Sequence, residues 1–429
     1  MRYKKINNTL FTQNRDNLIS LLKPNSLAIF NSNDIIPSNA DGTLGFRQNN
    51  DLFYLTGIDQ EETILVLFPE NPDESQREIL FIKETNEHIK VWEGNKLTKK
   101  EAEDISGIKK IFWTHQFEGV LKRIIYESQN IYLNLNEHDG GNHQFYSRDK
   151  LFAQQIRNDF PLHTFERAAP LLHQLRAIKH PIEVELIKKA LEITNKGFKR
   201  VIKSLKDKQF EFEIEAELTH EFLLNRSRGH AFAPIVASGE NACVLHYISN
   251  NDALKNGDLI LLDFGAEYAN YNADITRCLP VNGKFSKRQA EAYQSVLHIM
   301  RETSKLIITG NTMKNLRLEV GYLMETELIK LGLLSKTAIK NQNPESPLYK
   351  KYFPHGVSHY LGLDVHDVGN KHATFAPGML FTCEPGIYIP EEKLGIRLEN
   401  DILITETGNI DLCADIPIEM EEIEGLMRR

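Results

Sequence analysis

Short apolar runs, separated by charged stretches that favour helices, make up the first third of the chain. The runs are four to six residues long and contain several β-branched or aromatic residues, which is typical of strands in an α/β layer. They are residues 27–30, 63–68, 78–82, 110–113 and 131–135. The segment 46–57 is polar at its start and aromatic at its end, and we expect it to lead into a strand.

From residue 169 onward the pattern changes to longer segments with apolar residues at helical spacing. Pro181 suits the first turn of a helix, and Ser286 with Gln289 three positions later is a capping box. Further helices are expected over 211–226, 286–310 and 312–332. A chain of 429 residues is too long for one ordinary core, so the change predicts two domains, 1–168 and 169–429.

Four apolar segments of the second half read as strands and carry most of its unusual acidic residues. They are 258–265, 274–281, 379–389 and 395–405, and Asn282-Gly283 marks a turn after the second. Strands hold side chains more rigidly than loops do, so acidic residues placed there are good candidates for a site.

The composition narrows the function classes. Hydrophobic residues make up 41% and charged residues 26%, as in a soluble globular protein, and the net charge is −8. This balance argues against nucleic acid or an anionic membrane as a partner. The four cysteines form no CxxC pair and read as reduced thiols. The N-terminal segment lacks the apolar stretch of a secretory signal, so we expect a cytoplasmic location.

The common catalytic signatures HExxH, GxSxG, GxGxxG and the P-loop are absent. Two acidic residues in apolar strands remain: Asp263 ends the run LILLD, and Asp274 opens the next strand. A buried carboxylate is costly unless it is paired, protonated or bound to a cation. An isolated aspartate in this position more often ends a strand and forms hydrogen bonds. For the two together, a cation site is as plausible as that structural role.

The segment HGVSHYLGLDVHD (355–367) brings three histidines close in sequence: His355, His359 and His366. Gly356 and Gly362 favour a loop over a helix here. Most histidines are not ligands, but three within twelve residues, with His246 elsewhere, strengthen the case. Neutral imidazole suits metal ligation or proton transfer near pH 7.

Glu384 precedes a Pro-Gly turn, and Glu399 is expected inside a strand, two residues after Arg397 and on the same face. The arginine either forms a simple ion pair or orients a ligand or substrate. Four carboxylates and one imidazole suit Mn²⁺, Co²⁺, Fe²⁺ or Zn²⁺. Five such side chains with two bridging carboxylates can hold two cations.

These motifs resemble the "pita-bread" metallopeptidases. The resemblance covers 169–429 and rests on five motifs in the family's order: ILLDFGAEY (260–268), NADITR (272–277), HGVSHYLGLDVHDVG (355–369), EPGIYIP (384–390) and GIRLENDILIT (395–405). FRQNNDLFYLTG (46–57) and VWEGNKL (91–97) extend it toward the two-domain aminopeptidase P branch. It implies an α+β protein, in which a smaller α/β creatinase-type domain precedes the pita-bread domain.

The resemblance also implies a role for each candidate residue. The metal ligands would be Asp263, Asp274, His359, Glu384 and Glu399, with Asp274 and Glu399 bridging two divalent ions. Catalytic roles would fall to His246, His355, His366, Glu384 and Arg397. The substrate would be contacted by His246, His355, His366, Tyr388, Arg397 and Trp92, the last from across a subunit contact.

The implied activity is release of the N-terminal residue from peptides with proline second, by attack of a hydroxide that bridges the ions. The ions would be Mn²⁺, with Co²⁺ or Zn²⁺ as alternatives, and the assembly a homodimer or homotetramer. The N-terminal domain would serve oligomerisation and form the rim of the active site. One departure is Asn400, where the family often has Asp after the Glu399 position.

Two alternatives remain open. A prolidase would cut only Xaa-Pro dipeptides, although Ser358 in HGVSH and the tryptophan segment favour aminopeptidase P. A pita-bread binding protein without catalysis would typically have lost ligands, and all five ligand types are retained here. Creatinase-like enzymes lack the ligands, and methionine aminopeptidases lack so long an N-terminal domain.

Overall fold

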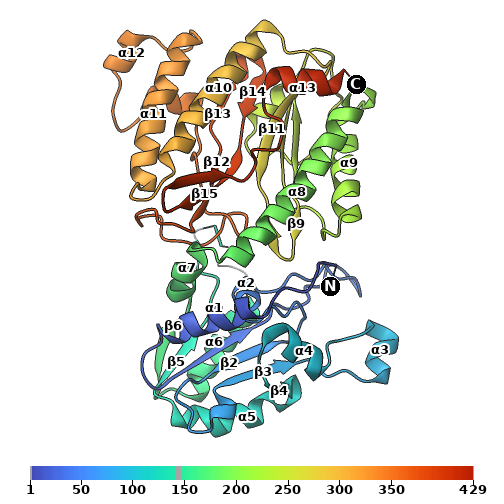
Figure 1. Ribbon diagram of the computed structural model, residues 1–429, viewed down its shortest axis with the longest axis vertical. Helices are drawn as coiled ribbons and strands as arrows, with labels where there is room; N and C mark the ends of the chain where they lie inside the picture. The colour runs from blue at the N-terminus through green and yellow to red at the C-terminus, as the bar shows by residue number, and fades with distance from the viewer. Residues whose placement is uncertain (1, 139, 142–145, 429) are drawn as a thin grey trace. The chain divides into compact units, whose positions relative to one another are not determined.

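The computed structural model describes residues 2–138, 140–141 and 146–428. The chain divides into two compact units, Tyr3–Arg176 and Ala177–Arg429, with Arg2 grouped with the second. Both units combine helices and strands (Figure 1), so the expected α+β class is confirmed.

The first unit is built on one six-stranded sheet with the order β4-β3-β2-β1-β5-β6. Its strands are β1 (Ser26–Asn31), β2 (Ile64–Leu67), β3 (Glu78–Ile82), β4 (Lys110–Trp113), β5 (Asn130–Leu133) and β6 (Thr164–Arg167). Strand β1 pairs antiparallel with β2 and parallel with β5, so the sheet is mixed. The five expected strands are confirmed within one to two residues at each end, and β6 was not expected.

Among the residues that the structure describes, seven α-helices accompany this sheet. They are α1 (Thr9–Ile19), α2 (Asn50–Thr56), α3 (Glu87–Glu93), α4 (Lys99–Ser106), α5 (Phe117–Ile124), α6 (Arg148–Asp159) and α7 (Ala169–Ala177). Alternate residues of β1 and β2 pack against the apolar faces of α5 and α6. Members of this core are Leu27, Ile29, Ile64, Val66, Phe117, Val120, Leu121, Ile124, Ile156 and Phe160.

The segment 46–57 contains helix α2 and does not lead directly into a strand. The side chain of Asn49 accepts hydrogen bonds from the backbone N–H groups of Asp51 and Leu52 and so caps α2. Gly57 ends the helix with φ 67°, where a Cβ would lie 2.2 Å from the ring of Phe11. The strand that follows, β2, starts seven residues later, so the sequence pattern missed this helix.

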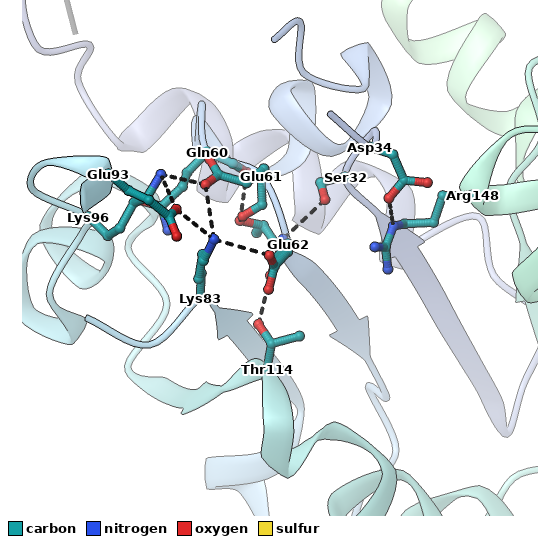
Figure 2. A network of polar contacts seen from close by, with 11 residues as sticks. Ser32, Asp34, Gln60, Glu61, Glu62, Lys83, Glu93, Lys96, Thr114 and Arg148 are labelled. Carbon is teal, nitrogen blue, oxygen red and sulfur yellow. Dashed lines mark hydrogen bonds and ion pairs between the residues drawn. The ribbon is translucent and has the colours of Figure 1, made fainter. Parts of the chain in front are cut away.

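A cluster of charged side chains, here called the lysine–glutamate network, lies beside the sheet of the first unit and consists of Glu61, Glu62, Lys83, Glu93 and Lys96 (Figure 2). Lys83 Nζ lies 3.2 Å from Glu62 and 2.8 Å from Glu93. Lys96 Nζ lies 2.5 Å from Glu61 and 3.4 Å from Glu93. Each ammonium group therefore has carboxylate partners.

The second unit places its strands between two groups of helices (Figure 1). Helices α8 (Pro181–Ser204) and α9 (Glu211–Leu224) lie on one side, and α10 (Lys287–Leu306) and α11 (Met313–Lys330) on the other. Two shorter helices are α12 (Lys336–Lys340) and α13 (Met420–Met427). Among the residues that the structure describes, no helix is long and apolar enough to cross a membrane.

The strands of this unit form four small sheets. Their orders are β11-β8-β7, β12-β15-β16, β13-β14 and β10-β9. The bounds are β7 (Ile235–Ser238), β8 (Leu259–Phe264), β9 (Glu267–Tyr268), β10 (Tyr271–Asn272), β11 (Ile275–Pro280), β12 (Leu380–Cys383), β13 (Gly386–Ile389), β14 (Leu394–Arg397), β15 (Asn400–Thr405) and β16 (Gly408–Asp411).

The helix predictions for this unit are confirmed. Pro181 is the first residue of α8, and Ser286 caps α10 through a capping box with Gln289. Helix α10 ends at Leu306, four residues before the expected Gly310.

The two C-terminal strand predictions each correspond to two strands. Pro385 separates β12 from β13, and Glu399 lies between β14 and β15 instead of inside one strand. The second of these expectations was wrong because the chain changes sheets at Glu399: β14 pairs with β13, whereas β15 pairs with β12.

Candidate metal centre

Asp263 and Asp274 are brought together by the antiparallel pair β8 and β11. Asp263 lies opposite Thr276, and Asp274 precedes β11 by one residue. The chain between them passes through the β9–β10 hairpin. Gly265 permits this path, since a Cβ at that position would lie 1.7 Å from the carbonyl oxygen of Ala273.

Glu384 and Glu399 both occupy short breaks between strands. Glu384 follows β12, and its N–H donates to the carbonyl oxygen of Val357 at 3.0 Å. Glu399 follows β14, and its N–H donates to the carbonyl oxygen of Thr276 at 3.1 Å. The Thr276 hydroxyl donates in turn to Glu399 Oε2 at 2.6 Å. Backbone hydrogen bonds therefore fix both acids although neither lies within a strand.

His359 lies in the loop that the glycines of 355–367 predicted. Its Nδ1 lies 2.9 Å from the carbonyl oxygen of Tyr360, which assigns the proton to Nδ1. Its Nε2 faces Asp274 Oδ2 at 3.6 Å and Glu384 Oε1 at 3.7 Å. One ligand atom each of Asp274, His359 and Glu399 lies within 4.8 Å of the others. These spacings are compatible with ligands around a shared cation.

The electrostatics of this group are unfavourable without a cation. Burial raises the pKa of Asp274 well above its usual value, and the charges of Glu399 and Asp263 raise it further. Burial and Asp263 raise the pKa of Glu399 to about 8. The Oδ1 atoms of Asp263 and Asp274 are buried without a hydrogen-bond partner among the described residues. Buried, unsatisfied carboxylate oxygens next to an imidazole fit divalent cations.

Arg397 supplies positive charge to this group. Its guanidinium is buried and donates to Asp263 Oδ2 at 2.5 Å, to Thr276 Oγ1 at 3.2 Å and to the hydroxyl of Tyr388 at 2.7 Å. One arginine thus partly offsets the charge of the acids and connects Asp263, through Thr276, to Glu399.

His355 extends this connection through Tyr388. Its Nδ1 lies 2.7 Å from the carbonyl oxygen of Gly356, so Nε2 accepts from the Tyr388 hydroxyl at 2.8 Å. Burial, with the charge of Arg397, lowers the pKa of His355 to about 4. Burial and His366 lower the pKa of His359 to about 3. Both imidazoles are therefore neutral at pH 7.

The remaining candidates lie at different distances from this group. His366 is exposed, and its ring stacks on His359 with centroids 4.1 Å apart. His246 is exposed, and its charge disfavours protonation of His355. Trp92 belongs to α3 in the first unit and is 77% exposed. The structure therefore brings His366 against His359, and it places Trp92 on the surface of the first unit.

Two residues of the site were not anticipated from the sequence. Thr276 contacts both Glu399 and Arg397, and Asp401 accepts a hydrogen bond from the N–H of Asp274 at 3.3 Å. Asp401 is fully buried, and burial and Glu399 raise its pKa well above the usual value. Both residues lie within motifs already singled out, but a hydroxyl and a second acid next to a ligand carry no distinct sequence signal.

Comparisons with known proteins cover nearly the whole chain. The profile of metallopeptidase family M24 matches residues 185–406, and that of the aminopeptidase P N-terminal domain matches 11–132. Xaa-Pro aminopeptidases from Haemophilus influenzae and Escherichia coli are both 34% identical, over 97% of this chain and 96% and 97% of theirs. Xaa-Pro aminopeptidase 3 from Homo sapiens is 32% identical over 89% of this chain and 76% of its own.

Solved structures agree with these matches. A Bacillus anthracis protein described as an aminopeptidase P superimposes with a TM-score of 0.91 at 36% identity, covering 99% of both chains. Escherichia coli aminopeptidase P, in a zinc-substituted form with product, gives a TM-score of 0.87 at 32% identity and covers 99% of both chains.

Proposed function

Because the chain belongs to metallopeptidase family M24, we propose that it is an Xaa-Pro aminopeptidase, which releases the first residue of peptides whose second residue is proline. The observation that carries the proposal is the group of four carboxylates and one imidazole in the second unit, in which Asp274 and Glu399 are buried and the other three are half-buried. Similarity to Xaa-Pro aminopeptidases over both units supports this specificity.

Two divalent ions are the proposed cofactors, with Mn²⁺ as the native metal and Co²⁺ or Zn²⁺ as substitutes. Asp263, Asp274, His359, Glu384 and Glu399 would hold them, with Asp274 and Glu399 shared between the two. When bound, the ions supply Lewis acidity toward the scissile carbonyl group and activate water. The donor types support this assignment, because oxygen-rich sets with one imidazole suit these metals.

The chain's own residues would act as follows. Arg397 donates a hydrogen bond to Asp263 and holds the Tyr388 hydroxyl against His355. Neutral His355, and His366 beside His359, lie where they can donate or accept a proton near the ligands. Glu384, with its raised pKa, is suited to carry a proton toward the proline nitrogen that leaves. His366 would also stabilise the negative charge that develops on the carbonyl oxygen.

Other assignments rest on the family alone and stay proposals. His246 would contact the peptide, and Trp92 would do so across a subunit contact in a homodimer or homotetramer. The catalytic residues proposed here all belong to 169–429, whereas 1–168 would serve assembly and the rim of the active site. The cytoplasm is the proposed location.

A peptide panel tests the proposal. Metal-free enzyme, reloaded with Mn²⁺, is given a tripeptide Gly-Pro-Gly, the dipeptide Gly-Pro and the tripeptide Gly-Ala-Gly, and released glycine is quantified. We expect cleavage of the first, with at least about tenfold lower kcat/KM for the third. Turnover of Gly-Pro alone would make the protein a prolidase, and turnover of none would refute peptide hydrolysis at Xaa-Pro bonds.

A further inference from the structure

The segment that carries His246 runs from the end of β7 to the start of β8, and its part 239–252 is here called the His246 loop. The loop begins with a short 3₁₀ helix, Gly239–Cys243, which packs against β14. A Cβ at Gly395 of β14 would lie 2.2 Å from the carbonyl oxygen of Ala242. The start of the loop therefore rests on the strand that ends in Arg397.

A single carboxylate holds both ends of this loop. Glu211, the first residue of α9, is fully buried. Its Oε1 accepts from the N–H and hydroxyl of Ser238, both at 2.8 Å, and from Asn241 Nδ2 at 3.1 Å. Its Oε2 accepts from the N–H of Asp252 at 2.9 Å. The carboxylate thus connects the first residues of the loop to the last.

The same carboxylate reaches the middle of the loop through Tyr247, the neighbour of His246. The Tyr247 hydroxyl donates to Glu211 Oε2 at 2.7 Å. Burial and this carboxylate raise the pKa of Tyr247 to about 12, so the phenol remains a donor at physiological pH. Five hydrogen bonds to the two oxygens of one buried carboxyl group connect the start, the middle and the end of the segment at a single point.

We propose that Glu211 is a positioning residue that acts through Tyr247 to hold His246 at the metal centre. Glu211 touches none of the proposed ligands, so its effect on catalysis passes through the loop. This inference rests on the proposed function, since it takes His246 to contact the peptide. The proposal stands on geometry, since the five donors to Glu211 come from residues at the start, the middle and the end of this segment.

A double-mutant cycle between Tyr247 and His246 tests the inference. Tyr247→Phe removes one hydroxyl, and we expect it to lower kcat/KM for the Xaa-Pro tripeptide about three- to tenfold. We expect His246→Ala alone to lower kcat/KM at least about tenfold. In that background, Tyr247→Phe should lower kcat/KM by less than about twofold. Tyr322→Phe on α11, where the ring is 63% exposed, is the matched control and should leave kcat/KM unchanged.

Additive losses in the cycle would overturn the inference, because a hydroxyl that merely stabilises the fold lowers activity equally in both backgrounds. Wild-type activity in His246→Ala would overturn it as well. Metal content and thermal unfolding, measured for each variant, show that the proteins compared are folded and loaded.

Hydrogen–deuterium exchange provides a readout that does not depend on peptide hydrolysis. Glu211→Gln presents an amide N–H₂ to donors on one side of the carboxylate, so exchange within 239–252 should rise about tenfold or more. Unchanged exchange would refute the anchoring role even in an active enzyme. If Glu211→Gln raises exchange but the wild-type protein cleaves no Xaa-Pro peptide, the anchor is supported and the proposed function is refuted.

Discussion

Two groups of charged side chains, one in each unit, differ in how fully their negative charges are paired with positive ones. In the lysine–glutamate network of the first unit, two ammonium groups lie among three carboxylates, and several of these side chains reach solvent (Figure 2). In the second unit, Asp263, Asp274, Glu384 and Glu399 are joined by the buried Asp401, and Arg397 is ion-paired with one of them.

The comparison separates a structural group of charges from one built for a ligand. A partly hydrated network of alternating charges is stable as it stands, although each pair contributes little. A buried acidic group with orphaned oxygens destabilises the fold until protons or cations arrive. The excess of negative charge, more than the number of charged residues, therefore makes the group in the second unit the candidate for ligand binding.

The largest effect is expected from neutralising one acid of the metal centre. Glu399→Gln should lower kcat/KM at least about a thousandfold, because a shared ligand is lost. It should also raise the unfolding temperature of the metal-free protein, because repulsion falls. Kinetics on reloaded enzyme and calorimetry on chelated enzyme measure the two effects.

The matched control is Glu62→Gln in the lysine–glutamate network. It should leave kcat/KM within about twofold, and it should not raise the unfolding temperature, since Glu62 lies 3.2 Å from Lys83 and relieves no repulsion. Equal effects of the two substitutions would remove the distinction between the groups.

The next substitution removes positive charge from the metal centre, where Glu399→Gln removes negative charge. Arg397→Met should destabilise the metal-free second unit by about 3–5 kcal/mol, since Asp263 is left as an uncompensated buried charge. Added Mn²⁺ should recover much of this loss, which calorimetry with and without metal measures.

Arg148→Met in the first unit is its counterpart, because Arg148 pairs with Asp34 at 2.6 Å on the surface. This variant should lose less than about 1 kcal/mol and show no rescue by metal. A loss of stability in Arg397→Met that metal leaves unchanged would mean that the arginine does not offset the charge of the ligands.

A buried acid of the first unit shows a third arrangement, in which a proton takes the place of a cation. Burial raises the pKa of Asp149 to about 7, and amide groups of Asn31 and Asn49 donate to its carboxyl group at 3.0 and 3.2 Å. Between pH 4 and 7 the folded chain keeps a proton that the unfolded chain has released. The free energy of unfolding should therefore fall as pH rises, by up to about 1.4 kcal/mol per pH unit.

Both tryptophans of the chain, Trp92 and Trp113, belong to the first unit, so urea unfolding followed by their fluorescence reports on this effect. Asp149→Asn should reduce the change in the free energy of unfolding between pH 5 and 7. An unchanged slope in the variant would assign the dependence to other groups.

The smallest effect is expected within the lysine–glutamate network itself. Lys83→Met leaves Glu62 and Glu93 with one lysine fewer, but both carboxylates are partly exposed and water replaces the ammonium group. We expect a loss of less than about 1 kcal/mol, reduced further at high salt, in the same fluorescence assay. Bound metal should stay at the wild-type amount; a loss of metal would tie this network to the centre.

The sequence predicted those parts of the fold that depend on local patterns. Apolar runs located five strands of the first unit, and caps such as Ser286 located helices of the second. Helix α2 was missed because its cap, Asn49, lies in a polar stretch that gives no helical periodicity. The change of sheet at Glu399 was missed because the flanking residues read as one continuous apolar strand.

The candidate site was predicted in a different way. Asp263 and Glu399 are 136 positions apart, and no local sequence pattern predicts that two such residues lie close together in the fold. Their placement in or beside apolar strands suggested one oxygen-rich site, and the resemblance to a family assigned each residue its role. Thr276 and Asp401, which connect and support the ligands, depend on strand pairing in three dimensions and could not be found from residue type alone.

The most direct test of the central claim is the number of metal ions that the acidic group binds when activity appears. Mn²⁺ is titrated into chelated enzyme, and bound metal and release of glycine from Gly-Pro-Gly are measured together. Two ions per chain should bind as activity rises from near zero, and Glu399→Gln should bind fewer. Full activity with less than about 0.1 ion per chain, or two ions bound in both proteins with equal activity, would contradict the claim.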